Sequence, residues 1–326
     1  MSNAREPRIL IVGAQKGGTT SLASALSADS RFWLPNGETP LFEDPIYDLR
    51  GAETLEGLRA SAPAGKIAAI KRPDWLGRPE APARMAQDCP DAVVVCALRS
   101  RAERTVSAYY WYLQTRLIPF LPLNDGLSRI LDHIEFGGSA PSPRASEVVT
   151  YSLYGAGIER ILTAGYEREK VLVGHARSSG PAEFDLLKML QRSFDLDTAI
   201  GHSQGRRRNP GVYDYRRIRL LRGRSRILDR GRHGSVAQQS RLLPALSFTS
   251  KSVTTIERTL FARWGDTSPA DLRPDIRERL DAHFQADDER FEAAVGHALS
   301  TVLGVGALPA RNDPKATRPS ILEVSR

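Results

Sequence analysis

The stretch ILIVGAQKGGTTSL, residues 9–22, decides the fold. Its first five residues form a short apolar run rich in β-branched side chains, which is typical of a buried parallel strand. The chain then passes a lysine and two glycines and takes up helical spacing, so we predict a helix over 20–26. A strand that turns directly into a helix is typical of an α/β protein.

Further apolar runs repeat this pattern along the chain. Strands are predicted at 92–99 and 170–174 and, more weakly, at 66–71, and helices at 101–116 and 154–164. Strands that alternate with helices predict a three-layer α/β sandwich with a central parallel sheet. In such sheets ligands bind beyond the carboxyl ends of the strands.

We expect a single domain over 1–305, because 326 residues fall within the range of one large α/β domain. Stretches rich in Pro and Gly, FGGSAPSPR at 136–144 and GRRRNPG at 205–211, indicate loops near the site. They belong to two expected insertions, about 117–150 and about 205–250. Residues 271–295 indicate an amphipathic pair of helices, and 306–326 a poorly ordered tail.

Composition limits the class of protein. The formal net charge of +8 favours anionic partners, and 41% hydrophobic residues are ordinary for a soluble protein. Cys89 and Cys96 form neither a disulfide framework nor a zinc motif, and we expect both to be reduced in a cytoplasmic protein. We expect neither a signal peptide nor a membrane span, because MSNAREPR at 1–8 has no long apolar stretch and no later run approaches the ~18 apolar residues that would span a bilayer.

The turn after the first strand has the composition of a phosphate-binding loop. Gly17 and Gly18 permit backbone conformations that other residues resist, and the amides at the start of a helix attract anions. Lys16 adds a cation, and Thr19 and Thr20 add hydroxyl donors. The alternative is a plain turn between strand and helix, which the order of the lysine, glycines and threonines makes less favoured.

A metal-dependent nucleotide kinase is a competing interpretation of this loop. Its motif, G-x-x-x-x-G-K-[ST], places lysine after the glycines, whereas Lys16 precedes them, and the second strand ends in Arg99 where a magnesium site needs a carboxylate. We expect Arg99 and Ser107 to hold one phosphate. Arg104 fits a phosphate ligand and a solvated helix start equally well.

These residues resemble the sulfotransferases that use 3'-phosphoadenosine 5'-phosphosulfate (PAPS), in particular the heparan-sulfate-type and bacterial branch. GAQKGGTTSL at 13–22 is similar to the family's 5'-phosphosulfate loop, and LRSRAERTVSAYYW at 98–111 to its 3'-phosphate element. The likeness runs from Arg8 to about Gly211. It implies a fold related to the P-loop nucleotide kinases, PAPS as donor, 3'-phosphoadenosine 5'-phosphate (PAP) as product, and no metal.

The resemblance also implies roles for the donor-binding residues. Residues 16–20 would hold the 5'-phosphosulfate, and Arg99 and Ser107 the 3'-phosphate. SQGRRRNP at 203–210 is similar to a late loop that closes over the nucleotide, which makes Gly205 and Arg206 donor-binding candidates; a solvated basic loop explains GRRR nearly as well.

Two further stretches concern catalysis. NGETPLFED at 36–44 resembles the family's Lys-Glu-Pro-x-Phe-Phe, whose glutamate takes the acceptor's proton, so Glu38 is the candidate base. AIKRPDWL at 69–76 resembles Glu-Lys-Ser-Pro-x-Tyr, which places Lys71 beside the transferred group. Ile70 replaces that glutamate, so the local charge balance departs from the pattern. His175, directly after a strand, is the reserve base.

The acceptor expected from the resemblance is a hydroxyl, less favourably an amine, of a carbohydrate, glycolipid or natural product, bound on the side of the two insertions. Tyrosines and Trp111 around 109–112 fit an acceptor cleft or the core. Arg216–Arg232 fits a contact with a membrane surface, an anionic acceptor or a partner protein, and equally a lid. Nucleic acid is not expected as a partner. The alternatives to a sulfotransferase are the kinase and a non-catalytic binder of PAPS or PAP.

Overall fold

The computed structural model describes residues 6–43, 47–176, 181–201, 212–219, 221–222 and 268–304. Its described strands form one sheet in the order β2-β3-β1-β4-β5, and every pair is parallel. Their bounds are β1 Pro7–Gly13, β2 Phe32–Trp33, β3 Ile67–Lys71, β4 Val93–Ala97 and β5 Val171–Gly174. The four predicted strands are confirmed, and the short edge strand β2 was not anticipated.

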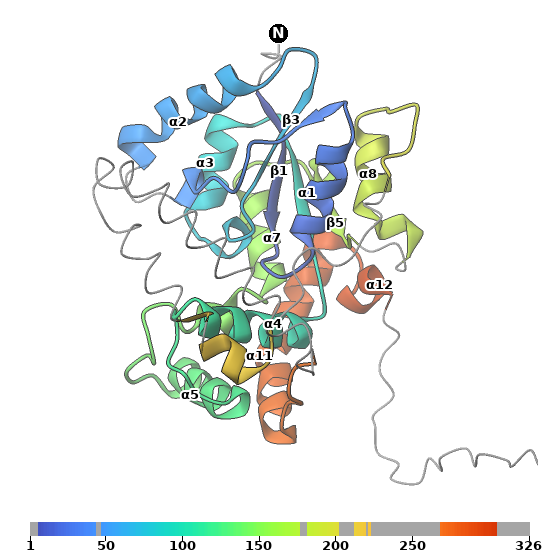
Figure 1. Ribbon diagram of the computed structural model, residues 1–326. Helices are drawn as coiled ribbons and strands as arrows, with labels where there is room; N and C mark the ends of the chain where they lie inside the picture. Colours follow the sequence, from blue (N-terminus) through green and yellow to red (C-terminus); the bar gives the residue numbers. More distant parts are fainter. Residues whose placement is uncertain are drawn as a thin grey trace, which may run out of the picture.

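Helices cover both faces of this sheet (Figure 1). Their bounds are α1 Thr19–Ala28, α2 Tyr47–Ser61, α3 Ala81–Asp88, α4 Arg101–Gln114, α5 Leu123–Phe136, α6 Glu147–Thr150, α7 Tyr154–Thr163, α8 Leu186–Ser193, α11 Pro274–Val295 and α12 Leu299–Leu303. Short 3-10 helices are η1 Leu41–Glu43, η2 Trp75–Gly77, η3 Arg168–Lys170 and η4 Ala182–Phe184. Residues 215–219 and 221–222 are also helical.

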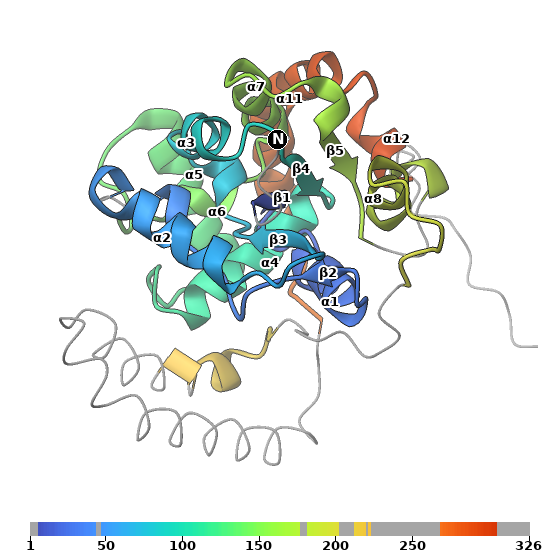
Figure 2. The ribbon, with the colours of Figure 1, turned by 90° about the horizontal axis from the view of Figure 1, so that it is seen from above.

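The alternation of side chains along β1 builds two cores. Leu10 and Val12 face the layer of α2, α3, α7 and α11, whereas Ile9 and Ile11 face α1 and α8. Figure 2 shows α3, α7 and α11 on one side of the strands and α1 on the other. The predicted three-layer α/β sandwich with a central parallel sheet is therefore confirmed.

A third core lies beyond the carboxyl ends of the strands, where α4, α5 and the first half of α11 pack together with residues 212–218. The interval 117–150, expected as a loop insertion, contains α5 and α6. The amphipathic heptad pattern of α5 explains why: Leu123, Leu127, Ile130 and Leu131 are all buried in this core. Within the described ranges, no helix has both the length and the apolar character needed to cross a membrane.

The prediction of a helical pair over 271–295 is wrong, because Pro274–Val295 is one continuous helix. No glycine interrupts it, and its sole proline stands at the first position, where proline is tolerated. A buried carboxylate fixes this helix to its neighbours. Asp287 is buried, ion-paired with Arg101 of α4 and hydrogen-bonded by the amides of Gly155 and Ala156 at the start of α7.

Candidate functional site

The loop between β1 and α1 is shaped by close approach to β4. The amide of Ala14 donates to the carbonyl of Ala97 at 2.7 Å, and a Cβ at Gly17 would stand 2.0 Å from that same carbonyl oxygen. Gly18 has φ +106° and Lys16 has φ +68°, so the residues on either side of Gly17 have positive φ angles. Position 17 therefore admits only glycine.

The amides at the start of α1 are available to a ligand. In the described part of the chain, the backbone N–H groups of Gly18, Thr19 and Thr20 have no hydrogen-bond acceptor; the ladder of the helix begins with Ser21 and Leu22, which donate to the carbonyl of Gly18. Free amides at a helix N-terminus, together with its positive dipole end, favour an anion. The predicted cradle therefore has its donors in place.

Lys16 is placed where positive charge accumulates. Burial first, and then the charges of Arg99 and Arg104, lower its pKa from 10.5 to about 8. No carboxylate among the described residues pairs with it. An anion bound in this loop would remove the repulsion between these three cations.

Arg99 and Ser107 follow the end of β4, the strand next to β1. The carbonyl of Arg99 accepts the hydroxyl of Tyr154 at 3.0 Å, and its Nε contacts Glu103 at 2.7 Å. Glu103 and Ser107 lie four residues apart on α4, so Arg99 and Ser107 share one side of the start of that helix. Ser107 is a buried residue of that helix.

Arg104 fits neither of its two expected roles, because it is completely buried and its donors are used within the protein. Nε donates to the carbonyl of Gln15 at 3.1 Å, Nη2 to Gln15 Oε1 at 3.1 Å, and Nη1 to the carbonyl of Val148 at 2.7 Å. It therefore ties the loop between β1 and α1, residues 14–18 and called the donor loop below, to α6. Its positive charge still reaches Lys16, as the lowered pKa of that lysine indicates.

The structure brings the two catalytic candidates together. Lys71 Nζ lies 3.0 Å from Glu38 Oε1, and Arg72 Nη1 lies 3.4 Å from Glu38 Oε2. Lys71 ends β3 and pairs in register with Ile11 of β1, so this ion pair stands beside the donor loop. The side chain of Glu38 is 36% exposed, so its carboxylate can be reached from solvent.

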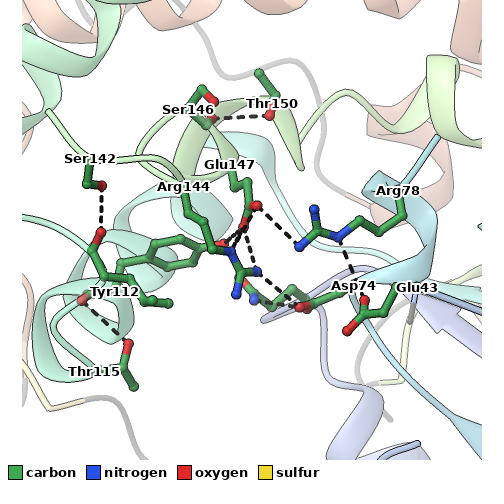
Figure 3. A network of polar contacts seen from close by, with 12 residues as sticks. Glu43, Asp74, Arg78, Tyr112, Thr115, Ser142, Arg144, Ser146, Glu147 and Thr150 are labelled. Carbon is green, nitrogen blue, oxygen red and sulfur yellow. Dashed lines mark hydrogen bonds and ion pairs between the residues drawn. The ribbon is translucent and has the colours of Figure 1, made fainter. Parts of the chain in front are cut away.

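Arg72 links this pair to a network of charged side chains, part of which is drawn in Figure 3. Arg78 contacts Glu43 at 3.7 Å and Glu147 at 3.3 Å, while Arg144 contacts Glu147 at 2.7 Å and Asp74 at 3.5 Å. Tyr112 donates to Glu147 Oε2 at 2.6 Å. Burial of the hydroxyl first, and then the charge of Glu147, raise the pKa of Tyr112 well above its usual range.

Sequence inspection missed this network. Its one signal in the sequence was the density of charged residues directly after β3, in KRPDWLGR at 71–78. That signal is weak, because ordinary loops carry such residues too. The predicted loop at 136–144 takes part in it by delivering Arg144.

The burial and contacts of His175 argue against its role as the reserve base. It is buried directly after β5, and its Nε2 lies 2.9 Å from the carbonyl of Pro181. Gly205 and Arg206 lie outside the described residues, as does most of Arg216–Arg232. Of that stretch, Arg222 donates to the carbonyl of Ile118 at 3.1 Å.

Core packing claims most of the aromatic residues of α4. Tyr109 and Tyr112 are buried in the third core, and Tyr110 packs edge-on against Tyr213 with ring centroids 5.1 Å apart. Trp111 lies only partly buried against the same core. Among the described residues, no group of His, Cys, Asp and Glu side chains has an arrangement that would hold a metal ion.

Comparison with known proteins shows partial similarity to sulfotransferases. No protein-family profile matches the chain. Heparan sulfate glucosamine 3-O-sulfotransferase 6 of Mus musculus is 36% identical over 107 residues, which are 32% of this chain and 30% of that protein. Heparan sulfate glucosamine 3-O-sulfotransferase 3B1 of Homo sapiens is 30% identical over 122 residues, 37% of this chain and 30% of that protein. The matched segment thus spans less than a third of either relative.

A solved structure covers far more of the chain. The crystal structure of the sulfotransferase from Alicyclobacillus acidocaldarius matches with a TM-score of 0.52 and 19% identity, over 90% of this chain and 98% of that one. The chain therefore has the fold of a sulfotransferase, and its expected similarity to sulfotransferases is confirmed.

Proposed function

We propose that this protein is a sulfotransferase that takes its sulfuryl group from PAPS. One observation carries the proposal: Lys16 stands at a helix N-terminus with free amides, close to two arginines, with no carboxylate of the described residues paired to it. Such a site is suited to a group of high negative charge. The fold supports the choice of a sulfated nucleotide over other anions.

The donor would lie across the ends of β1 and β4. Residues 16–20 are suited to its 5'-phosphosulfate, and Arg99 and Ser107 to its 3'-phosphate. Ser107 supports this division, because it stands on the side of α4 that Arg99 shares. Gly205 and Arg206 are proposed to complete the donor site.

The donor supplies an activated sulfuryl group, and the residues of this chain would position it and stabilise charge. In an in-line displacement, the bond between sulfur and the phosphate oxygen breaks as the acceptor oxygen bonds to sulfur. Lys16 would neutralise the charge that grows on the leaving oxygen, and Lys71 the charge on the other sulfuryl oxygens. The acceptor's proton would go to Glu38, a base contribution of ~10²–10⁴-fold.

The proposed acceptor is a hydroxyl group of a carbohydrate, glycolipid or natural product, with an amine less favoured. The partial similarity to proteins named for glucosamine 3-O-sulfation supports a sugar hydroxyl. The exposed position of Glu38 supports an acceptor that approaches from solvent. We propose a cytoplasmic location and a contact of Arg216–Arg232 with the acceptor or an anionic surface, consistent with the net charge of +8.

Calorimetric titration with PAP in EDTA, with ATP as the comparison, tests the donor site. We expect metal-independent binding of PAP that Arg99→Ala abolishes and that Arg279→Ala, a change on the remote α11, leaves intact. Binding of ATP that requires magnesium, with none of PAP, would replace this proposal with the kinase. PAP binding without any transfer from PAPS would favour the non-catalytic binder.

A further inference from the structure

Arg72 is the residue that joins the candidate base to the rest of the protein. It follows the last residue of β3, and its amide donates to the carbonyl of Ile11 at 3.0 Å, which fixes its backbone to β1 just before the donor loop. Its guanidinium reaches Glu38 at 3.4 Å, Asp74 at 3.5 Å and Glu43 through a short hydrogen bond. One side chain thus binds two carboxylates of the stretch 36–44 and one that lies two residues further along its own turn.

The buried carboxylates of Glu43 and Asp74 hold the guanidinium of Arg72 in place. The side chains of Glu43 and Asp74 are only 9% and 8% exposed, whereas that of Arg72 is 23% exposed. Arg78 also contacts Glu43, and Arg144 and Gln15 also contact Asp74, so both carboxylates are held from several sides. An arginine shared between two carboxylates that are already fixed loses little further freedom when it also binds Glu38. The planar fork of Arg72 can therefore fix the direction of the base.

Asp74 extends the connection to the donor loop. Its Oδ1 accepts a hydrogen bond from Gln15 Nε2 at 3.0 Å, and Gln15 Oε1 accepts one from Arg104 Nη2. Gln15 directly precedes Lys16, so a continuous series of polar contacts runs from the donor loop through Asp74 and Arg72 to Glu38.

Lys71 holds Glu38 in a different way. Its Nζ contacts Glu38 Oε1 and no other carboxylate of the described residues. Because a lysine is a flexible point charge with one partner here, it can turn toward a bound sulfuryl group without breaking any other contact. Glu38 would then keep Oε2 on Arg72 and have Oε1 free to accept a proton.

We propose that Arg72 is the positioning residue of the base. It holds the carboxylate of Glu38 in a fixed direction relative to the donor loop, while Lys71 contacts the transferred sulfuryl group. The proposal rests on the proposed sulfotransferase function. It also gives a purpose to the arginine that stands at the serine position of the Glu-Lys-Ser-Pro-x-Tyr pattern.

A double-mutant cycle of Arg72→Gln and Glu38→Gln tests the proposal. The measured rate is release of PAP from PAPS, with heparan sulfate as acceptor and with water alone, and PAP affinity is measured by calorimetry on each variant. Because a misplaced catalytic group costs on the order of 10²-fold, we expect Arg72→Gln to lower kcat by about that factor with PAP affinity within about twofold of wild type. Arg72→Lys should recover part of the rate.

The cycle separates positioning from general destabilisation. If Arg72 acts through Glu38, the double variant is no slower than Glu38→Gln alone, since coupled residues are not additive. Arg279→Gln is the matched control, because Arg279 also bridges two carboxylates, Asp132 and Glu135, is 25% exposed, and lies on the remote α11. We expect it to leave kcat and PAP affinity unchanged.

Three results would overturn the proposal: an unchanged kcat in Arg72→Gln, losses that multiply in the double variant, or a loss of PAP affinity that matches the loss of rate. Wild-type protein that binds PAP but releases none from PAPS would also overturn it, since there would be no working base to position. Failure of wild type to bind PAP at all would instead refute the proposed function.

Discussion

Lys16 provides the most demanding test of the donor site, because the side chain that should bind an anion should also destabilise the protein without one. Burial and the charges of Arg99 and Arg104 lower its pKa from 10.5 to about 8. A protonated lysine with a lowered pKa is less favourable in the folded chain than in the unfolded chain. We therefore predict that Lys16→Met stabilises the ligand-free protein and abolishes PAP binding.

The size of the stabilisation follows from the shift in pKa. A change from 10.5 to about 8 corresponds to about 3 kcal/mol at ~1.36 kcal/mol per pKa unit. Because solvent screens part of this cost at a partly exposed side chain, we expect a gain of about 1 to 2 kcal/mol at neutral pH. For 326 residues, an unfolding entropy of ~2.1 cal/mol/K per residue converts this gain to a rise in Tm of roughly 1.5 to 3 °C.

The sign of the pH dependence identifies the cause. Below about pH 8 Lys16 is protonated in the folded and the unfolded chain, so wild type carries the full destabilisation. As the pH rises from about 8 to 10.5, the folded protein has released a proton that the unfolded chain retains, and wild type gains stability relative to Lys16→Met. The difference between the two proteins should therefore be largest at neutral pH and shrink above pH 8.

Urea unfolding of both proteins at about pH 7 and about pH 9.5 measures this difference. Methionine keeps a Cβ at this position, so the backbone with φ +68° is equally strained in both proteins. In parallel, PAP affinity of wild type should fall above pH 8, because the anion binds the protonated lysine. A variant no more stable than wild type at neutral pH, or a difference that is the same at both pH values, would refute the reasoning.

Three other predictions concern the frame around the site. Gly17→Ala should abolish PAP binding in calorimetry, because its Cβ would stand 2.0 Å from a β4 carbonyl oxygen; retained affinity would show that the loop can move away. Asp287→Ala should lower the free energy of unfolding by about 3 to 5 kcal/mol in urea, since it removes the buried partner of Arg101 and the acceptor of the amides of Gly155 and Ala156, and a loss below 1 kcal/mol would contradict this. Burial raises the pKa of Cys89 and Cys96 to about 12, so neither thiol should react with Ellman's reagent near pH 8 until the protein unfolds.

The sequence predicted the sheet and the donor loop because both are encoded by neighbouring residues. A strand needs only a short apolar run, and the loop needs glycines and a lysine at fixed positions within ten residues. The helices α2, α3, α5 and α8 were missed for the opposite reason: their apolar positions become meaningful only against a partner surface.

The polar network could not be predicted in this way. Gln15 and Asp74 are 59 residues apart, and Arg104 reaches a carbonyl 44 residues away. Charged residues in loops are usually solvated, so nothing in the sequence distinguishes Arg72, which binds three carboxylates, from an ordinary surface arginine. Only the approach of separate segments reveals which of them share a partner.

The altered charge around Lys71 illustrates how the fold replaces a missing residue. Ile70 stands where the sulfotransferase pattern has glutamate, and it is fully buried in the sheet, where a charge would be costly. Arg72 adds a positive charge at the next position but one, so that Lys71 and Arg72 together carry one positive charge more than Glu38 neutralises. Glu43 and Asp74 supply the two opposing charges from η1 and from the turn after β3. Because both carboxylates bind Arg72 and neither binds Lys71, the compensation leaves Lys71 with Glu38 as its sole ionic partner among the described residues, and so free to exchange that partner for a bound anion.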